Sequence, residues 1–286
     1  EGGEVEQLLL TNEGDKPILL LDGEELLGAK QNRSINLTIL AAARKSTIIP
    51  VSCVEAGRWN SSSEHFTTSQ SVAFLRMRAE KAGQVSESLR RDRSHRSDQT
   101  KVWDSIHEKA CFLQAPSDTG AMSEIFKRYD HSMDEFCQAF TITDNQVGAL
   151  FAINGEIQGF EFFDATSTLE KIFPKLIRSY AIDAIEKRSD SSDKKNSADK
   201  IEIKEVKEFL QRVSNCEFES YPATGLGEDV RFSARELCGG GLINNNHVVH
   251  LCAFKIKSSD NSGRRNTYDE YTDYSNVASM LRRHAG

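Results

Sequence analysis

One hairpin signal constrains the fold of this chain more than any other feature. Residues 147–153 and 156–163 are two apolar, strand-like runs, and only Asn154 and Gly155 separate them. An Asn-Gly pair between two such runs is the preferred sequence of a type I′ turn, because both central positions of that turn need positive φ angles. A two-residue turn joins antiparallel neighbours only. The chain is therefore expected to contain antiparallel sheet.

The first sixty residues also have the pattern of short strands. Asp22 and Gly23 predict a second two-residue hairpin turn. Pro50 cannot donate a hydrogen bond to a sheet, so its strand is expected to lie at a sheet edge or to begin near that proline. The close spacing of the strands predicts an antiparallel sheet or a small sandwich. The predicted strands span residues 17–21, 24–29, 34–42 and 47–55.

The rest of the chain alternates helical and strand-like segments. Apolar residues at three- and four-residue intervals predict helices, and Pro174 suits the first position of one of them. Runs of glycine at 239–241 and of asparagine at 244–246 predict turns between the last strands. The other predicted helices span residues 68–91, 101–113, 119–140 and 203–213, and the last strands 217–221, 230–237 and 247–257. The predicted class is α+β, with antiparallel β-sheet or sandwich blocks and packed helices.

Four segments are expected along the chain. Residues 1–60 form an N-terminal β block, and residues 61–190 form a helical segment with a β-hairpin and a helix in the same domain. Residues 191–200 are rich in serine, aspartate and lysine and are expected to be a flexible loop. Residues 201–286 form a C-terminal α/β segment, and its polar tail is expected to be mobile from Ser258.

Composition argues against several functional classes. The 286 residues carry a formal net charge of −7, so non-specific binding to nucleic acid is not expected. No apolar run approaches the roughly 20 residues that a membrane helix needs. The six cysteines have neither CxxC pairs nor regular spacing, which indicates reduced thiols in the cytoplasm. No ligand spacing argues for a zinc site, and metal dependence is left open. The common phosphate-loop, dinucleotide, serine-hydrolase and metalloprotease motifs are missing.

The densest group of chemically functional residues closes the first β block. Alternation along a strand puts Cys53 and Glu55 on one face, and a turn at Gly57 lets Arg58 and Trp59 approach the strand end. A nearby guanidinium lowers the pKa of a thiol, so Cys53 is a candidate nucleophile and Glu55 a candidate general base. The alternative, which residue types alone favour, is a buried thiol beside a structural ion pair between Glu55 and Arg58.

A second polar cluster precedes that strand. It consists of Glu24, Glu25, Gln31, Asn32 and Arg33. Amide and guanidinium groups together suit recognition of a phosphate, a carboxylate or the edge of a base. The alternative is a solvated edge strand whose charges prevent aggregation, which is the commoner case for these residue types.

A basic segment offers a further alternative. Residues 76–101 hold eight lysines and arginines but only four aspartates and glutamates. The basic residues include Arg90, Arg91, Arg93 and Arg96. Such a segment can bind RNA or phosphate. Few aromatic residues interleave with the charges, so a solvated helix end is the favoured interpretation.

Three motifs together resemble a known family. They are Leu21-Asp22-Gly23-Glu24-Glu25, Gln31-Asn32-Arg33, and the run 49–59 that contains Cys53, Glu55, Arg58 and Trp59. They are similar to the prokaryotic domain named for its association with ADP-ribosylglycohydrolases and rhodanese-type phosphatases, over residues 5–186. The resemblance implies a link to NAD and ADP-ribose metabolism and supplies no established reaction. It also implies that Gln31, Asn32, Arg33, Cys53, Glu55, Arg58 and Trp59 form one site.

Together these features predict a cytoplasmic domain that binds a nucleotide-like ligand linked to NAD or ADP-ribose. In that hypothesis Arg33 and Arg58 hold phosphates, Trp59 stacks on a base, and Gln31 and Asn32 orient polar groups. Glu24 and Glu25 are included among the binding residues. The rival hypothesis is a non-enzymatic protein-interaction module in which the same residues form a structural corner. Catalysis, cofactors and oligomeric state are left open by the sequence.

Overall fold

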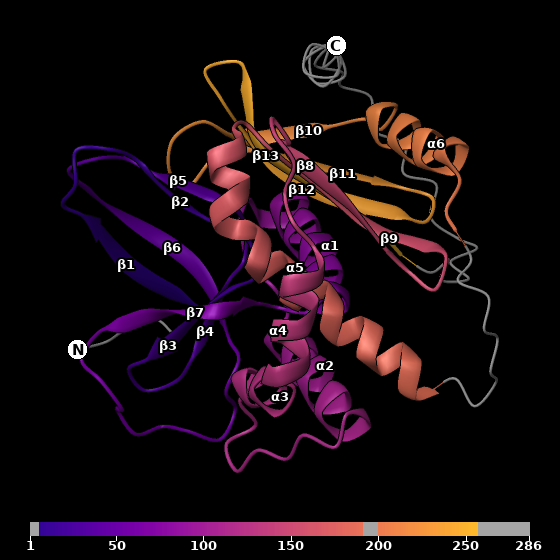
Figure 1. The fold of residues 1–286 in the computed structure, drawn as a ribbon. Coiled ribbons are helices and arrows are strands. Elements are labelled where there is room, and N and C mark those ends of the chain that lie inside the picture. Colours follow the sequence, from indigo (N-terminus) through magenta and orange to yellow (C-terminus); the bar gives the residue numbers. More distant parts are fainter. Residues whose placement is uncertain (1–5, 191–199, 257–286) are drawn as a thin grey trace.

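The predicted α+β class is confirmed. The computed structural model of the protein describes residues 6–190 and 200–256 (Figure 1). These residues contain six helices and thirteen strands, and the strands form three antiparallel sheets. Residues 191–199 of the predicted flexible loop and residues 257–286 of the predicted mobile tail lie outside the described residues.

Two sheets are built from the N-terminal strands. The five-stranded sheet has the order β1 (Gln7–Asn12), β6 (Lys45–Cys53), β4 (Arg33–Ile35), β3 (Glu24–Gly28) and β7 (Phe66–Val72). Strands β2 (Ile18–Leu20) and β5 (Ile39–Ala41) pair with each other. Their apolar side chains share one core cluster, which contains Leu20, Leu26, Ile35, Leu37, Ile39, Ile49 and Val51. The N-terminal block is therefore a β structure with its own interior.

The six-stranded sheet joins the central hairpin to the C-terminal strands. Its order is β10 (Glu219–Pro222), β11 (Glu228–Ala234), β12 (Leu237–Asn244), β13 (His247–Lys255), β9 (Glu156–Phe163) and β8 (Gly148–Ile153). The predicted type I′ hairpin is confirmed, because Ile153 pairs with Glu156 and both Asn154 and Gly155 have positive φ angles. Pairing of β9 with β13 then joins the hairpin to the C-terminal strands, with β8 as an edge strand of the sheet.

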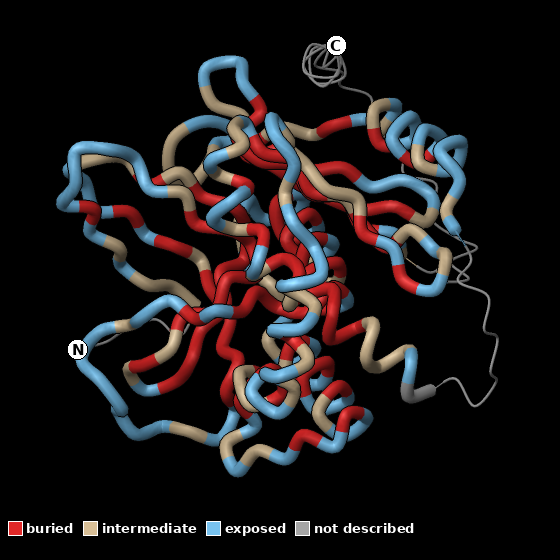
Figure 2. Tube along the Cα trace, in the orientation of Figure 1, coloured by how far each residue is buried: buried red, intermediate tan, exposed pale blue. Residues whose placement is uncertain are grey.

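Helices cover both faces of the six-stranded sheet. The helices are α1 (Leu75–Asp92), α2 (Gln99–Phe112), α3 (Met122–Arg128), α4 (Asp130–Ala139), α5 (Thr166–Asp190) and α6 (Ile203–Ser214). Helices α1 and α5 share a core cluster with one face of the sheet, and α6 packs against the other face through Phe209 and Val213. Buried residues concentrate where α1 and α5 meet the strands, whereas the peripheral loops are exposed (Figure 2).

Asp22 and Gly23 do not close a two-residue hairpin. They form a turn in which the Glu24 amide donates to the Leu21 carbonyl, but β2 pairs with β5 while β3 pairs with β4 and β7. The Asp22 carboxylate is held by Arg78 of α1 instead. Tertiary contacts therefore separate two strands that the local turn chemistry would have paired.

Pro50 lies inside a strand that has neighbours on both sides. Strand β6 pairs with β1 and with β4, so the prediction of an edge strand or of a strand beginning at Pro50 is wrong. The Pro50 carbonyl accepts from the Asn36 amide, so the Pro50 nitrogen faces the same neighbour just beyond Ile35, where β4 has ended. The missing N–H therefore falls where no ladder bond is required.

Three helical predictions need correction. The segment predicted as one helix over 68–91 begins as β7, which pairs with β3, and α1 starts only at Leu75. The helix predicted over 119–140 is divided at Tyr129, whose hydroxyl donates to the Leu113 carbonyl. Pro174 lies within α5 rather than at its first position. Phe173 and Leu176 on either side of Pro174 are buried in the core, which holds the helix together across the proline.

The glycine run 239–241 is a strand interior rather than a turn. It lies in the middle of β12, and the preceding turn is at Arg235 and Glu236. A Cβ atom on Gly239 would come 2.2 Å from the Cys252 carbonyl oxygen and 2.3 Å from the Phe232 ring. The run therefore provides space for close packing between strands.

Candidate functional site

The segment after β6 is fastened to the loop that precedes α3. The Gly57 amide donates to the Thr119 carbonyl at 2.8 Å, and the Met122 amide donates to the Val54 carbonyl at 2.9 Å. A Cβ atom on Gly57 would approach the Thr119 backbone at 3.1 Å, so a glycine suits this crossing. The contacts bring Thr119 beside Glu55, 64 residues earlier in the chain.

Glu55 is the centre of this region. Its Oε2 atom lies 2.7 Å from Nη2 of Arg58 and accepts from the Asn32 amide at 3.1 Å, while its Oε1 atom accepts from the Thr119 hydroxyl at 2.9 Å. Burial raises the pKa of Glu55, but the hydrogen bonds from Arg58, Asn32 and Thr119 outweigh that effect and leave the pKa below its ordinary value. Glu55 is therefore an ionised carboxylate at neutral pH.

Arg58 crosslinks three loop segments through hydrogen bonds. Besides Glu55, it bonds to the carbonyl oxygens of Gly28, Ala29 and Asn60, the Ser62 hydroxyl and the Asn32 side-chain oxygen, at distances between 2.6 and 3.3 Å. Both terminal nitrogens of its guanidinium are engaged in these contacts. Its geometry therefore fixes the backbone around Glu55.

Gln31, Arg33 and Cys53 lie together and are buried. Nη1 of Arg33 donates to the side-chain and backbone oxygens of Gln31 at 3.2 and 3.3 Å, and Arg33 is paired with Cys53 in the β4–β6 register. The Gln31 amide group and the Cys53 thiol both donate to the Glu55 carbonyl. Burial lowers the pKa of Arg33. Gln31 and Cys53 thus hold the backbone of Glu55, and Arg33 holds Gln31. The catalytic role of Cys53 and the phosphate-binding role of Arg33 stay predictions.

The remaining predicted residues occupy different positions. Trp59 is 59% exposed and follows Arg58 on the surface. Glu24 forms an ion pair with Lys175 of α5, so it turns toward the helices. Glu25 is fully buried, and neither of its carboxyl oxygens has a hydrogen-bond partner. Six of the predicted residues are therefore in mutual contact, namely Gln31, Asn32, Arg33, Cys53, Glu55 and Arg58.

The environment of Glu25 favours its neutral form. Burial raises the pKa of Glu25 to about 8, against the influence of the Ser69 hydroxyl and the Ser123 backbone amide and with the added charge of Glu55. Neither serine contact reaches hydrogen-bond geometry at the carboxyl oxygens. Two acidic side chains near one another thus have pKa values shifted in opposite directions, which is common at functional sites.

An open cleft of about 400 Å³ lies in front of Glu55. Its lining combines two carboxylates, one amide and several hydroxyl groups, and no lysine or arginine lines it within residues 6–190 and 200–256. The lining residues are Leu27, Gly28, Asn32, Glu55, Ser62, Ser63, Thr67, Thr119, Ala121, Ser123 and Glu124. Sequence reasoning missed the hydroxyl residues, because serines and threonines in polar loops carry no pattern that distinguishes them from ordinary turns.

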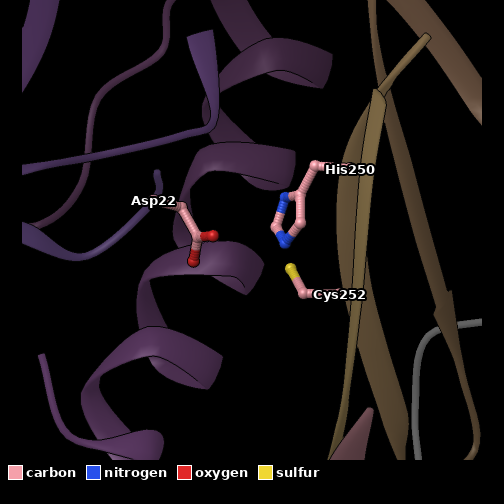
Figure 3. A group of neighbouring side chains, drawn as sticks. All are labelled: Asp22, His250 and Cys252. Carbon is pink, nitrogen blue, oxygen red and sulfur yellow. The ribbon is translucent and has the colours of Figure 1, made fainter. Parts of the chain in front are cut away.

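A separate cluster of titratable side chains lies deeper, between α1 and two sheets. The ligand atoms of Asp22, His250 and Cys252 lie within 4.8 Å of one another (Figure 3). However, the two ring nitrogens of His250 lie 2.8 Å from the Thr38 hydroxyl and 3.0 Å from a Glu161 oxygen. Because these ring nitrogens already have partners, the group does not present a free set of metal ligands.

Arg78 provides the positive charge of this buried network. Its guanidinium donates to both oxygens of Asp22, at 3.0 and 3.1 Å, and to Glu161 at 2.6 Å. Burial raises the pKa of Asp22, but the charge and hydrogen bond of Arg78, with smaller contributions from His250 and Lys81, together outweigh burial and lower the pKa to about 2. The Tyr180 hydroxyl also donates to Glu161. We interpret this network as structural, because it ties α1 and α5 to the N-terminal and C-terminal sheets.

Comparison with known proteins gives one match. A family model described as the ARG and Rhodanese-Phosphatase-superfamily-associated Protein domain matches residues 1–254. The chain belongs to this family. The match extends past the residues 5–186 indicated by the sequence motifs and includes the strands β10 to β12 and most of β13. No curated protein and no solved structure gives a significant match to the chain.

The family name supplies context rather than chemistry. It associates the domain with ADP-ribosylglycohydrolases and with the rhodanese-phosphatase superfamily, and it names neither a ligand nor a reaction. Among the described helices, none has the combination of length and apolarity required to cross a bilayer. Functional inference therefore depends on the site itself.

Proposed function

We propose that the cleft beside Glu55 binds a nucleotide-like ligand of NAD or ADP-ribose metabolism through the hydroxyl groups of its ribose. The observation that carries this proposal is the lining of the cleft, which offers carboxylates, an amide and hydroxyls without a cationic side chain. Carboxylate oxygens accept hydrogen bonds from sugar hydroxyls, and Ser, Thr and Asn side chains both donate and accept. The association in the family name with ADP-ribosylglycohydrolases supports this class of ligand.

The contacts favour Glu55 as the ligand-facing residue and Arg58 as its support. Glu55 lines the cleft and is ionised, whereas the terminal nitrogens of Arg58 are bonded to the protein. The Cys53 thiol is buried and does not line the cleft. We therefore propose Glu55 as the group that accepts a proton or a hydrogen bond from the ligand, and we assign no covalent step to Cys53.

Trp59 is proposed to stack on the base of the ligand. It belongs to the same loop as Ser62 and Ser63, which line the cleft, and its ring is largely exposed. An exposed tryptophan beside a polar cleft offers a flat apolar surface for an aromatic ring. Stacking there would supply apolar contact area that the polar lining lacks.

Thermal melting with defined ligands tests this function. We expect NAD or ADP-ribose to raise the melting temperature of the wild type, and Trp59→Ala to reduce the shift. Phe140→Ala is the matched control, because Phe140 is a similarly exposed aromatic residue (52%) that ends α4 and does not belong to the loop of Ser62 and Ser63. AMP and cyclic ADP-ribose identify the required part of the ligand, and mass spectrometry of the mixtures detects any product. No shift with any of these ligands would contradict the proposal.

A protein-interaction module is the second candidate, and one surface feature favours it. Leu9 of the edge strand β1 is paired with Ile48 of β6, and they are 70% and 55% exposed. Two adjacent exposed aliphatic side chains at a sheet edge favour association with another chain. Sedimentation velocity of the wild type and Ile48→Ser tests this candidate, which requires association that the substitution weakens.

The contacts of the basic segment argue against the RNA alternative. Arg90 pairs with Glu219, Arg91 with Asp92 and Arg96 with Glu6, and Arg93 lies over the Tyr221 ring. An oligoribonucleotide in the same melting series is expected to give no salt-dependent shift.

All six cysteines lie in the described part of the chain and are free thiols, which supports the proposed cytoplasmic location.

A further inference from the structure

The side-chain amide of Asn32 is bonded to the protein through its oxygen alone. Its Oδ1 atom accepts from the Gly28 amide and from Nη2 of Arg58, each at 3.1 Å. Because both partners are donors, the oxygen must face them and the Nδ2 group must point elsewhere. In the part of the chain that the structure describes, Nδ2 has no hydrogen-bond partner, although Asn32 is only 7% exposed. A buried donor that is held in place without an acceptor indicates a ligand.

This donor belongs to the cleft. Asn32 is one of the residues that line the cleft, and its Nδ2 atom is not among the described polar atoms that are both fully buried and unpartnered. The atom therefore keeps accessible surface on a side chain whose oxygen is turned toward Gly28 and Arg58. We conclude that the two N–H groups of Nδ2 face the cleft.

Glu55 supplies an acceptor next to that donor. Nη2 of Arg58 contacts both Oδ1 of Asn32 and Oε2 of Glu55, so the amide and the carboxylate lie side by side. Each carboxylate oxygen has about two accepting positions. Oε1 receives one hydrogen bond from the Thr119 hydroxyl, which leaves it room for another. Because Glu55 also lines the cleft, an amide donor and a charged acceptor are presented together.

The lining of the cleft indicates which chemical group this pair fits. Two hydroxyls on neighbouring carbon atoms match a donor beside an acceptor, because a hydroxyl can play either part. A carboxamide or the edge of a base also pairs a donor with an acceptor, but it belongs to a flat ring that favours aromatic or apolar walls. No aromatic side chain lines the cleft within residues 6–190 and 200–256, and five lining residues carry hydroxyl groups. The lining therefore favours a sugar.

We infer that Asn32 and Glu55 clamp the free vicinal diol of a ribose, with Nδ2 of Asn32 donating to one hydroxyl and the Glu55 carboxylate accepting from the other. The inference rests on the proposed function and names the part of the ligand that the site recognises. A carboxylate bound to a ribose hydroxyl is also how many dinucleotide sites hold their ligand. Arg58 positions both side chains of this diol clamp and does not itself touch the sugar.

The diol clamp also determines which ligands are excluded. A phosphate on either hydroxyl would place negative charge against Glu55, and no lysine or arginine of the described residues lines the cleft to balance it. A deoxyribose would leave one of the two clamp groups without its partner in the complex. The substrate class is therefore a nucleotide or an ADP-ribosyl group in which both hydroxyls of the bound ribose are unmodified.

Isothermal titration calorimetry of the full-length wild type tests the diol clamp from the ligand side. The probes are ADP-ribose and two analogues, one without the 2-hydroxyl of the adenosine ribose and one without that of the terminal ribose. We expect the analogue altered at the ribose in the cleft to bind about tenfold or more weakly than ADP-ribose. The other analogue is expected to bind like ADP-ribose itself.

Asn32→Asp tests the diol clamp from the protein side. The substitution keeps an oxygen toward Gly28 and Arg58 and replaces the Nδ2 donor by an acceptor. We expect affinity for ADP-ribose to fall about tenfold or more, and the difference between ADP-ribose and the weak analogue to disappear. Asn145→Asp adds the same charge at an exposed position outside the lining of the cleft, and it is expected to bind both ligands like the wild type.

Three outcomes would overturn the inference. Equal binding of ADP-ribose and both analogues by the wild type would remove the diol clamp and leave the proposed function standing. A deoxy penalty that a folded Asn32→Asp retains in full would remove Asn32 from it. If neither NAD nor ADP-ribose binds, the proposed function fails and the diol clamp fails with it. The comparison of ligands on the wild type decides the first outcome even where Asn32→Asp does not fold.

Discussion

Glu55 and Arg58 lie on either side of the turn at Ala56 and Gly57, with 2.7 Å between the carboxylate Oε2 and the guanidinium Nη2. The same guanidinium bonds to the carbonyls of Gly28 and Ala29 at the end of β3. One short ion pair thus connects the segment after β6 to a different strand of the same sheet. The pair determines where the wall of the cleft stands, and it keeps Glu55 charged.

Arg58→Ala is expected to destabilise the protein by about 2–3 kcal/mol, because it leaves a buried carboxylate and several carbonyls without their donor. The estimate is reduced because the Arg58 side chain is partly exposed. Urea unfolding measures the loss. Arg76→Ala is the control, since its ion pairs with Glu80 and Glu108 are at the surface and are expected to contribute less than about 1 kcal/mol. Equal losses of unfolding free energy in the two variants would show that Arg58 contributes no more to stability than a surface arginine.

The burial of Cys53 predicts slow alkylation of its thiol. Cys111 is exposed on α2, whereas Cys53 is buried between β4 and Gln99, the first residue of α2. Iodoacetamide treatment of the native protein, followed by peptide mass spectrometry, is expected to label Cys111 first and Cys53 only after denaturation. Equally rapid labelling of the two thiols would mean that Cys53 is accessible, and it would strengthen the prediction that Cys53 is a nucleophile.

Gly239 and Gly83 give opposite predictions for the same substitution. Gly239→Ala places a methyl group against the Cys252 carbonyl and the Phe232 ring, and we expect a loss of about 3 kcal/mol or more. Gly83 lies within α1 with no atom within 4 Å of the new methyl group, so Gly83→Ala is expected to stabilise the protein by about 0.5–1 kcal/mol. Thermal melting measures both, and a neutral Gly239→Ala would contradict the strand packing.

Lys81 predicts a rise of stability with pH. Burial lowers the pKa of Lys81 from 10.5 to about 7, and its amine donates to the Ser34 hydroxyl and the Ile35 carbonyl. Between these two pH values the unfolded chain binds more protons than the folded chain, so the contribution of Lys81 to stability increases from pH 7 toward pH 10.5. Below pH 7 the folded state carries the full cost of the buried charge.

Lys81→Met is expected to flatten this rise. The measurement is the free energy of unfolding in urea at several pH values between 6 and 9, expressed as the difference between wild type and variant. Lys101→Met is the control, because Lys101 is exposed and its ion pair with Asp98 is long, at 3.9 Å. Parallel stability curves for the wild type and Lys81→Met would contradict the lowered pKa.

The sequence by itself determined the features that depend on neighbouring residues. The turn at Asn154 and Gly155 follows from the φ angles that a two-residue hairpin needs, and the α6 helix follows from its apolar spacing. The run from Cys53 to Arg58 was recognisable as a possible site because its residue types are unusual together. Glu55 and Arg58 do form the ion pair expected as the structural alternative.

Only the tertiary structure decided which segments meet. The same dipeptide chemistry that makes a hairpin at Asn154 makes only a turn at Asp22, because Arg78 of α1 binds the Asp22 carboxylate and β3 pairs elsewhere. Thr119 reaches Glu55 from a distant loop, and Glu25 is left without a partner by strands on both sides. Local patterns specify φ angles and apolar faces, whereas long-range packing chooses among the partners that those patterns permit.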